Sequence, residues 1–99
     1  MLESTKIMTD ILTKQLLPSD QAMESRVGDE TVILHLENGT YYGLDRLGTR
    51  IWELLKDGVA PIAIGEILVR DHGAPPEIVE ADIRDLLSEL HAHGIIVDG

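Results

Sequence analysis

Histidine is the side chain best suited to proton transfer and metal binding near neutral pH, and this chain has four of them. His91 and His93 lie two residues apart in a predicted helix, so their rings point about 200° apart and do not readily share a metal ion. His35 and His72 lie far from this pair in the sequence. We interpret all four as surface or helix-end residues, and we expect no metal and no cofactor.

No other group of residues has the spacing of a catalytic site. The chain has no Cys, which excludes a thiol nucleophile, a disulfide and a thiolate metal site. Its serines do not lie in the strand-to-helix pattern of a nucleophile elbow, and its glycines do not form a phosphate-binding loop. The sequence therefore predicts a protein that is not an enzyme.

The balance of charge argues against a nucleic-acid partner. Eight Lys and Arg stand against eighteen Asp and Glu, which gives a formal net charge of −10. Affinity for nucleic acids comes largely from Lys and Arg beside phosphates, and the predicted last helix carries five acids and only Arg84. No segment approaches the ~20 apolar residues of a membrane span. Since the chain also lacks Cys and a secretory signal, we expect a cytoplasmic protein with no membrane partner.

A predicted β-hairpin comes before the helical part of the chain. Residues 31–37 have the composition of a strand, and Asn38-Gly39 favours a two-residue type I′ turn into a partner strand over residues 40–44. Val32, Leu34 and Leu36 would share one face, with Ile33 on the other. The sheet would then be apolar on both sides, which suggests that something packs on each. The predicted cross-strand pairs are Leu36 with Tyr41, His35 with Tyr42, and Ile33 with Leu44.

Three helices are predicted after this hairpin. Asp45 is placed to cap the first, whose apolar stripe is Leu47, Ile51, Leu54 and Leu55, and which should stop at Gly58. The second covers residues 61–71. The third runs from Pro75-Pro76 to about His93 and has the strongest helical period of the chain, and the apolar tail 95–97 should return to the core.

The expected fold class is α+β, with a winged-helix-like arrangement of a three-stranded antiparallel sheet followed by three helices. A weak edge strand over residues 21–27, after a turn at 17–20, supplies the first strand. Residues 17–99 form one domain. Residues 1–16 form an N-terminal extension that is either a short amphipathic helix or disordered, and that is either weakly docked or covers a groove or a second subunit.

From about Leu17 to Val97 the chain resembles the PqqD family, the RiPP recognition elements, which bind ribosomally made precursor peptides. The stretch YYGLDxxGxxIWELL over residues 41–55 is most similar to the stand-alone proteins of the lasso-peptide type. Outside this stretch, the residues that carry the resemblance are Leu34, Gly39, Ile67, Leu68, Val79, Asp82, Leu86, Leu87, Leu90 and Gly94-Ile95.

The resemblance implies a site in which a leader peptide adds as a strand between the third strand and the third helix. Asp82 would be a polar anchor for the peptide, although it could equally be a solvated helix acid, and Tyr41 and Leu86 could be core residues. The implied peptide-binding residues are Tyr41, Tyr42, Leu44, Ile78, Asp82, Asp85 and Leu86. The predicted core residues are Leu34, Leu36, Leu44, Ile51, Trp52, Leu54, Ile67, Val79, Ile83, Leu87 and Leu90.

The function implied is non-catalytic: the protein captures a leader peptide and presents it to a processing enzyme in lasso-peptide biosynthesis. The implied partner is a transglutaminase-like cysteine protease, followed by a cyclase, and leaders of this class carry a Tyr-x-x-Pro element that would enter an apolar pocket beside the groove. Two alternatives stay open, a PqqD-like peptide chaperone for a radical-SAM enzyme and an acidic winged-helix adaptor between proteins. An exposed edge strand and an apolar N-terminal segment also make a homodimer possible.

Overall fold

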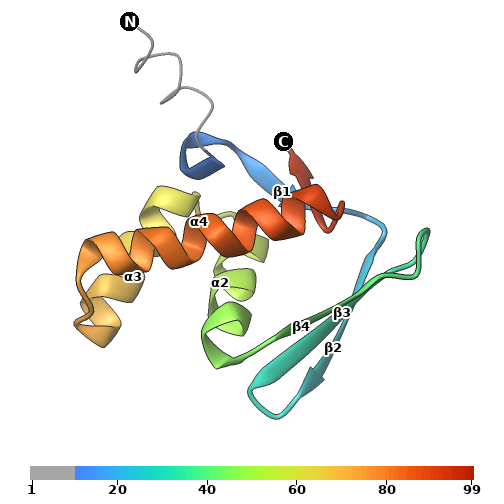
Figure 1. Ribbon diagram of the computed structural model, residues 1–99, viewed down its shortest axis with the longest axis horizontal. Helices are drawn as coiled ribbons and strands as arrows, with labels where there is room; N and C mark the ends of the chain where they lie inside the picture. Colours follow the sequence, from blue (N-terminus) through green and yellow to red (C-terminus); the bar gives the residue numbers. More distant parts are fainter. Residues whose placement is uncertain (1–10) are drawn as a thin grey trace, which may run out of the picture.

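The computed structural model of the protein describes residues 11–99 (Figure 1). The prediction for residues 1–16 falls mostly outside the described residues, but Leu12 and Leu16 at its end are buried in the core. The elements in chain order are the 3-10 turn η1 (Ile11–Thr13), the strands β1 (Leu16–Pro18), β2 (Ala22–Val27), β3 (Glu30–His35) and β4 (Tyr41–Leu44), the helices α2 (Arg46–Lys56), α3 (Pro61–His72) and α4 (Pro76–Ala92), and the strand β5 (Ile96–Asp98).

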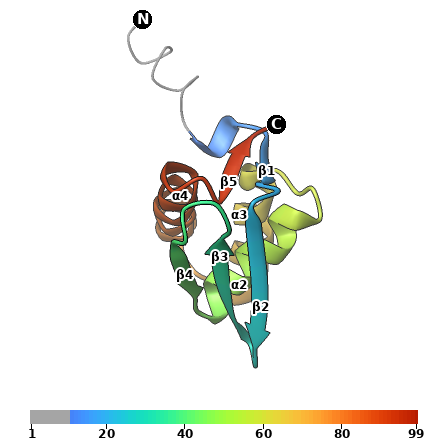
Figure 2. The ribbon, with the colours of Figure 1, turned by 90° about the vertical axis from the view of Figure 1, so that its right-hand side faces the viewer.

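The main sheet is antiparallel, with its strands in the order β2-β3-β4, and the three helices follow it in sequence. This confirms the predicted α+β fold. The helices lie on one side of the sheet and leave its other face open among the described residues (Figure 2). The core fills the space between the inner face of the sheet and the helices.

The predicted hairpin register is wrong by two residues. A loop over residues 36–40 replaces the two-residue turn, since Gly39 has a positive φ (73°) and Asn38 does not. Side chains satisfy the backbone of this longer loop: Asn38 N–H donates to His35 Nδ1 at 3.3 Å, and Thr40 N–H donates to Asn38 Oδ1 at 2.9 Å. The observed pairs are Thr31 with Leu44, Val32 with Gly43, Ile33 with Tyr42, and Leu34 with Tyr41.

The buried face of β3 is also not the one expected. Thr31, Ile33 and His35 are buried, whereas Leu36 is 50% exposed and Leu34 is half-buried on the opposite face. Polar residues can be buried here because they are hydrogen-bonded: Thr49 Oγ1 lies 3.0 Å from Thr31 Oγ1, and His35 accepts from the loop. The predictions that Leu34 and Leu36 are core and that His35 is a surface histidine are therefore wrong.

The rest of the predicted core is confirmed by burial, with Ile67 packed against it half-buried. Asp45 caps α2 as expected, with its Oδ1 accepting from Gly48 N–H at 2.8 Å. Leu47 departs from the predicted stripe, because its side chain is 37% exposed. The buried members of the predicted core are Leu44, Ile51, Trp52, Leu54, Val79, Ile83, Leu87 and Leu90, and Leu55 of the predicted stripe is buried as well.

The two ends of the described chain pair with each other in a second, two-stranded sheet. β1 and β5 are antiparallel, with Leu17 opposite Val97. The sequence predicted a turn at residues 17–20 and only an apolar tail at 95–97, so this pairing was missed. It forms because Gly94 (φ 75°) reverses the chain after α4 and because Ile95 and Ile96 are buried.

Candidate peptide-binding site

β4 is an edge strand, and its outer edge has no strand partner among residues 11–99. His35 N–H donates to Thr40 O at 2.9 Å, which fixes the phase of the antiparallel ladder. Since hydrogen-bonded pairs alternate in such a ladder, Tyr42 and Leu44 direct their backbone groups to β3. Tyr41 and Gly43 then direct their N–H and C=O groups to the open edge. The edge can accept hydrogen bonds from, and donate them to, a further strand.

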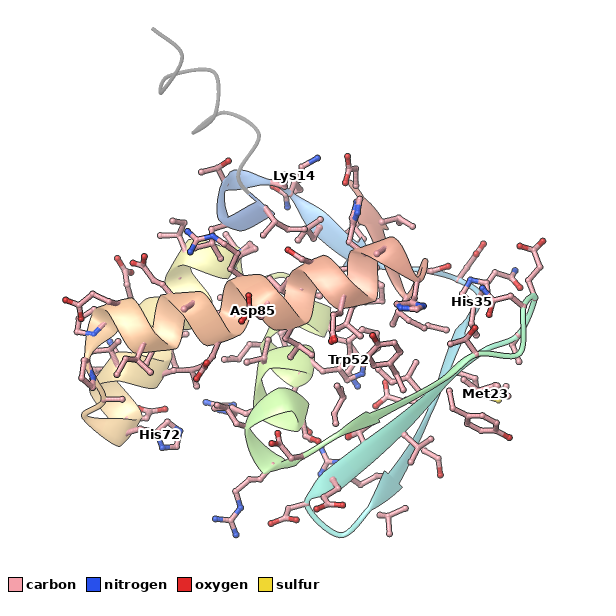
Figure 3. All side chains as sticks on the ribbon, in the orientation of Figure 1. Lys14, Met23, His35, Trp52, His72 and Asp85 are labelled. Atoms are coloured by element: carbon pink, nitrogen blue, oxygen red, sulfur yellow. The ribbon has the colours of Figure 1, made fainter. Side chains whose placement is uncertain are left out.

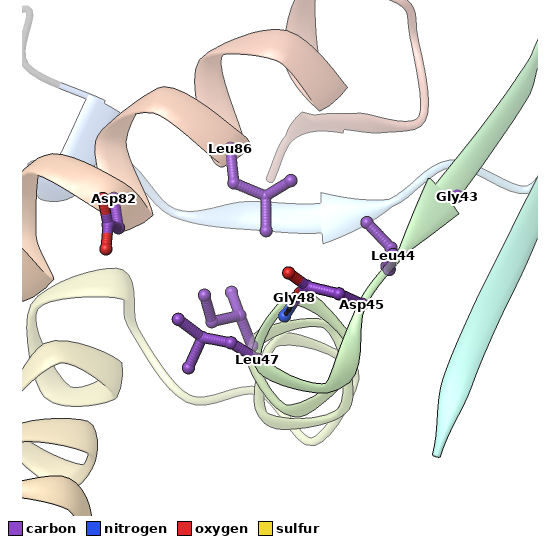
Figure 4. A pocket seen from close by; sticks show the side chains of 8 residues that line it. Gly43, Leu44, Asp45, Leu47, Gly48, Asp82 and Leu86 are labelled. Carbon is purple, nitrogen blue, oxygen red and sulfur yellow. Dashed lines mark hydrogen bonds between the residues drawn. The ribbon is translucent and has the colours of Figure 1, made fainter. Parts of the chain in front are cut away.

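A cleft of about 450 Å³ lies beside this edge, between the β4–α2 junction and α4 (Figure 4). Three of the residues predicted from the resemblance meet here: Leu44 from the strand, and Asp82 and Leu86 from α4. Figure 4 shows the Leu86 side chain directed toward Leu44 and Leu47 across the opening. The other residues that line the cleft are Gly43, Asp45, Gly48 and Ile51.

The first turn of α2 contributes to the cleft, although only structural roles were predicted for its residues. Asp45 was predicted as a helix cap and Leu47 as part of the apolar stripe of this helix, yet both line the cleft. Gly48 brings α2 close to the strand, because a Cβ at this position would lie 3.3 Å from Leu44 Cβ. The spacing Leu44-Asp45-x-x-Gly48 was therefore the available signal for this wall of the site.

The other predicted site residues do not all face the cleft. Tyr41 is 71% exposed on the outer face of the sheet. Ile78 lies farther along α4, in a small apolar cavity of about 90 Å³ that shares Leu47 and Asp82 with the cleft. Asp85 is exposed on α4 and is not among the residues that line either space (Figure 3).

Tyr42 joins β4 to α4 at one end of the cleft. Its ring lies 5.1 Å from that of His93 between centroids, and its hydroxyl lies close enough to the Glu89 carboxylate to feel its charge. Burial and the negative charge of Glu89 raise the pKa of the Tyr42 hydroxyl, so it stays protonated beside the carboxylate. Asp82 lies seven residues before Glu89, about 10.5 Å along the helix, and the cleft opens there.

The cleft carries negative charge and has no Lys, Arg or His among its lining residues. The Asp45 carboxylate is engaged in capping α2. Asp82 is exposed, and its carboxylate makes no ion pair within residues 11–99. It is therefore available to a donor or a cation on a bound molecule.

Within residues 11–99 no three His, Asp or Glu side chains lie close enough to hold a metal ion. No helix in this range has the length and apolarity required to cross a membrane.

Comparisons with known proteins agree with this geometry. The family model described as coenzyme PQQ synthesis protein D (PqqD) matches residues 30–96. The solved structure of TbiB1 in complex with the TbiA(beta) leader peptide is 38% identical, with 80% of this chain and 92% of that chain covered and a TM-score of 0.76. A lasso peptide synthetase B1 complexed with the leader peptide is 20% identical over 84% of this chain and 98% of that chain, at a TM-score of 0.77, and it shows the same fold. No curated protein matches the chain. The family match and the identity to TbiB1 show that the chain belongs to the PqqD family.

Proposed function

We propose that this protein binds the leader of a ribosomally made precursor peptide and presents it to a processing enzyme in lasso-peptide biosynthesis. The observation that carries the proposal is the open edge of β4, which lies directly beside the cleft. An extended peptide would add there as a fourth strand, with main-chain hydrogen bonds to Tyr41 and Gly43. TbiB1, which is 38% identical, has its structure in complex with a leader peptide, and this supports the same role here.

Side chains of the added strand would alternate between the two faces of the sheet. Those directed inward would enter the cleft and contact Leu44 and Leu86, with Asp82 available for a hydrogen bond or a cationic group. The small cavity around Ile78 would take an apolar side chain, which is where a Tyr-x-x-Pro element would fit. Tyr42, packed against His93 and lying beside Glu89, would close the inner side of the groove at its far end.

The proposed role is binding alone, in the cytoplasm, with catalysis left to the partner. We assign a transglutaminase-like cysteine protease as that partner, because TbiB1 and the lasso peptide synthetase B1 are the relatives with leader peptides bound. A second candidate is delivery of a peptide to a radical-SAM enzyme, favoured by the family description as a coenzyme PQQ synthesis protein. The two are distinguished by which enzyme accepts the leader-bound protein.

A direct test is titration of the protein into a fluorescent TbiA(beta) leader peptide, followed by polarisation. We expect saturable binding with a Kd well below about 100 μM, which corresponds to more than about 5.5 kcal/mol. A scrambled leader of the same composition is the control for non-specific attraction. If neither this leader nor leaders of other lasso precursors bind at about 100 μM, the proposed function is wrong.

A further inference from the structure

A third space adjoins the candidate site, and most of the charge at its walls is positive. It has a volume of about 240 Å³ and lies where the first turns of α2 meet the C-terminal end of α3. The chain as a whole has a formal net charge of −10, so this space differs in sign from most of the surface. We call it the basic cavity, and its lining residues are Arg46, Leu47, Arg50, Asp71 and His72.

The basic cavity shares residues with the two spaces of the candidate site. Leu47 lines the cleft, the small cavity around Ile78 and the basic cavity. His72 lines the cavity around Ile78 and the basic cavity, and Asp82 lines the cavity around Ile78 and the cleft. The three spaces therefore follow one another in a series that starts beside the open edge of β4 and ends at the C-terminus of α3.

The charge of the walls changes sign along this series. The cleft has Asp45 and Asp82 among its lining residues and no described cation. The cavity around Ile78 is lined mostly by apolar side chains, and the two arginines follow in the basic cavity. A long ligand that occupied all three spaces would match them with a donor or cation at one end, an apolar group in the middle and an anion at the other end.

Both arginines of the basic cavity keep hydrogen-bond donors for such an anion. Arg46 donates from Nε to Asp29 Oδ2 at 2.8 Å, and a guanidinium has further N–H donors on its two terminal nitrogens. Arg50 Nη2 lies 3.8 Å from Asp71 Oδ2, which is longer than a hydrogen bond. A carboxylate is the anion that fits best, because it can accept two parallel bonds from one guanidinium.

We propose that the basic cavity binds an acidic side chain of the captured leader peptide and so contributes to the choice of leader. This inference rests on the proposed function. A peptide strand on the edge of β4 runs past Leu44 to the β4–α2 junction, and its continuation lies over the cavity around Ile78 and then over the basic cavity. An Asp or Glu in that continuation meets the arginines, whereas Asp45 and Asp82 repel it from the cleft.

The test combines a neutral variant of the cavity with a charge scan of the peptide. Arg50→Gln removes one cation from the cavity. Arg70→Gln is the matched control, because Arg70 is also exposed and carries the same charge but does not line any of the three spaces. The probe is the fluorescent TbiA(beta) leader, made in two versions for each position, one with Glu and one with Gln at that position. Polarisation gives the affinities, and melting temperatures show that each variant is folded.

We expect one position outside the strand at which the wild type binds the Glu peptide about threefold to fivefold more tightly than the Gln peptide. This preference should disappear in Arg50→Gln and stay in Arg70→Gln, which is the coupling expected for a direct contact. The inference is overturned if no position prefers Glu, or if the preference survives Arg50→Gln. It is equally overturned if both variants lose the preference, since that indicates general attraction. A wild type that binds no version of the leader refutes the proposed function instead.

Discussion

The strip between β4 and α4 has two ends that are built from similar parts and behave differently. At one end Tyr42 reaches α4, where its ring contacts His93 and its hydroxyl lies beside Glu89. At the other end Leu44 faces Asp82 and Leu86 across a cleft of about 450 Å³. Each end has a strand side chain opposite an acid on the helix. Only the tyrosine carries a hydroxyl that can satisfy that acid, so the leucine end is left open for a ligand.

The two ends of the strip therefore have different roles. The closed end holds the edge strand against the helix and contributes to stability. The open end exposes Leu86 and an uncommitted carboxylate, and contributes to binding. Substitutions should therefore separate the two effects, because the ends lie about two helical turns apart.

The largest effect is expected from Trp52→Ala, which removes the support common to both ends. Trp52 is 2% exposed on α2, next to Ile51, whose side chain lines the cleft. Truncating a buried Trp leaves a cavity and costs about 3–5 kcal/mol. Urea denaturation should show this loss. A variant as stable as wild type would mean that α2 does not support the site.

Leu86→Ala should weaken binding at the open end with a small effect on the fold. Leu86 is half-buried beside the cleft, so its truncation removes apolar contact with a bound peptide. We expect leader affinity to fall about tenfold, a cost of about 1.4 kcal/mol. Ile62→Ala on α3 is the control, since Ile62 is 48% exposed and does not line the cleft. Equal affinities for the two variants would remove Leu86 from the site.

Asp82→Ala and Asp85→Ala compare two acids of α4 that differ in their position relative to the cleft. Asp82 lines the cleft and Asp85 does not. A lost hydrogen bond from a charged group costs about 1.5–3 kcal/mol when buried and less when exposed, so we expect roughly a fivefold loss for Asp82→Ala. Asp85→Ala should bind like wild type in the same polarisation assay. The reverse order would place the peptide over the other side of α4.

Tyr42→Phe should have the smallest effect and should act on stability. The substitution keeps the ring against His93 and removes the hydroxyl that lies beside Glu89, at a cost of at most about 1 kcal/mol. The Tyr42 pKa is raised above its ordinary value of 10.0, so this contribution is complete below pH 10.0 and is lost as the pH rises above it.

The free energy of unfolding should be measured by denaturation below and above pH 10.0. The values for wild type and Tyr42→Phe should converge at the alkaline end. Leader affinity at neutral pH should not change. A large loss of leader affinity would show that the peptide contacts this end too, and that the distinction between the ends does not hold.

The sequence predicted the fold well where periodicity and capping determine it. The long apolar period of α4 and the Asp45 cap of α2 are both present in the structure. Prediction failed where side chains satisfy backbone or buried polar groups in ways that the pattern of apolar residues does not encode. The loop at Asn38 shifted the register of the hairpin. Thr31 and His35, which are hydrogen-bonded, lie on the buried face of β3, whereas Leu34 and Leu36 lie on the opposite face.

The candidate site was predicted only in part. Leu44, Asp82 and Leu86 meet because a strand end and a helix stripe converge, which the family resemblance implied. The wall formed by Asp45, Leu47 and Gly48 depends on the close approach of α2 to β4, a tertiary contact that no local pattern reports. The outward direction of Tyr41 follows from the register of β4 against β3. That register could not be predicted without knowing the length of the hairpin loop.

The most direct measurement is amide hydrogen exchange at β4, followed residue by residue by NMR with and without the TbiA(beta) leader peptide. Strand addition predicts that the amides of Tyr41 and Gly43 exchange freely in the unbound protein and become protected when the leader binds. The amides of Tyr42 and Leu44, already bonded to β3, should be protected in both states. Saturable binding that leaves Tyr41 and Gly43 as exposed as before would contradict the account.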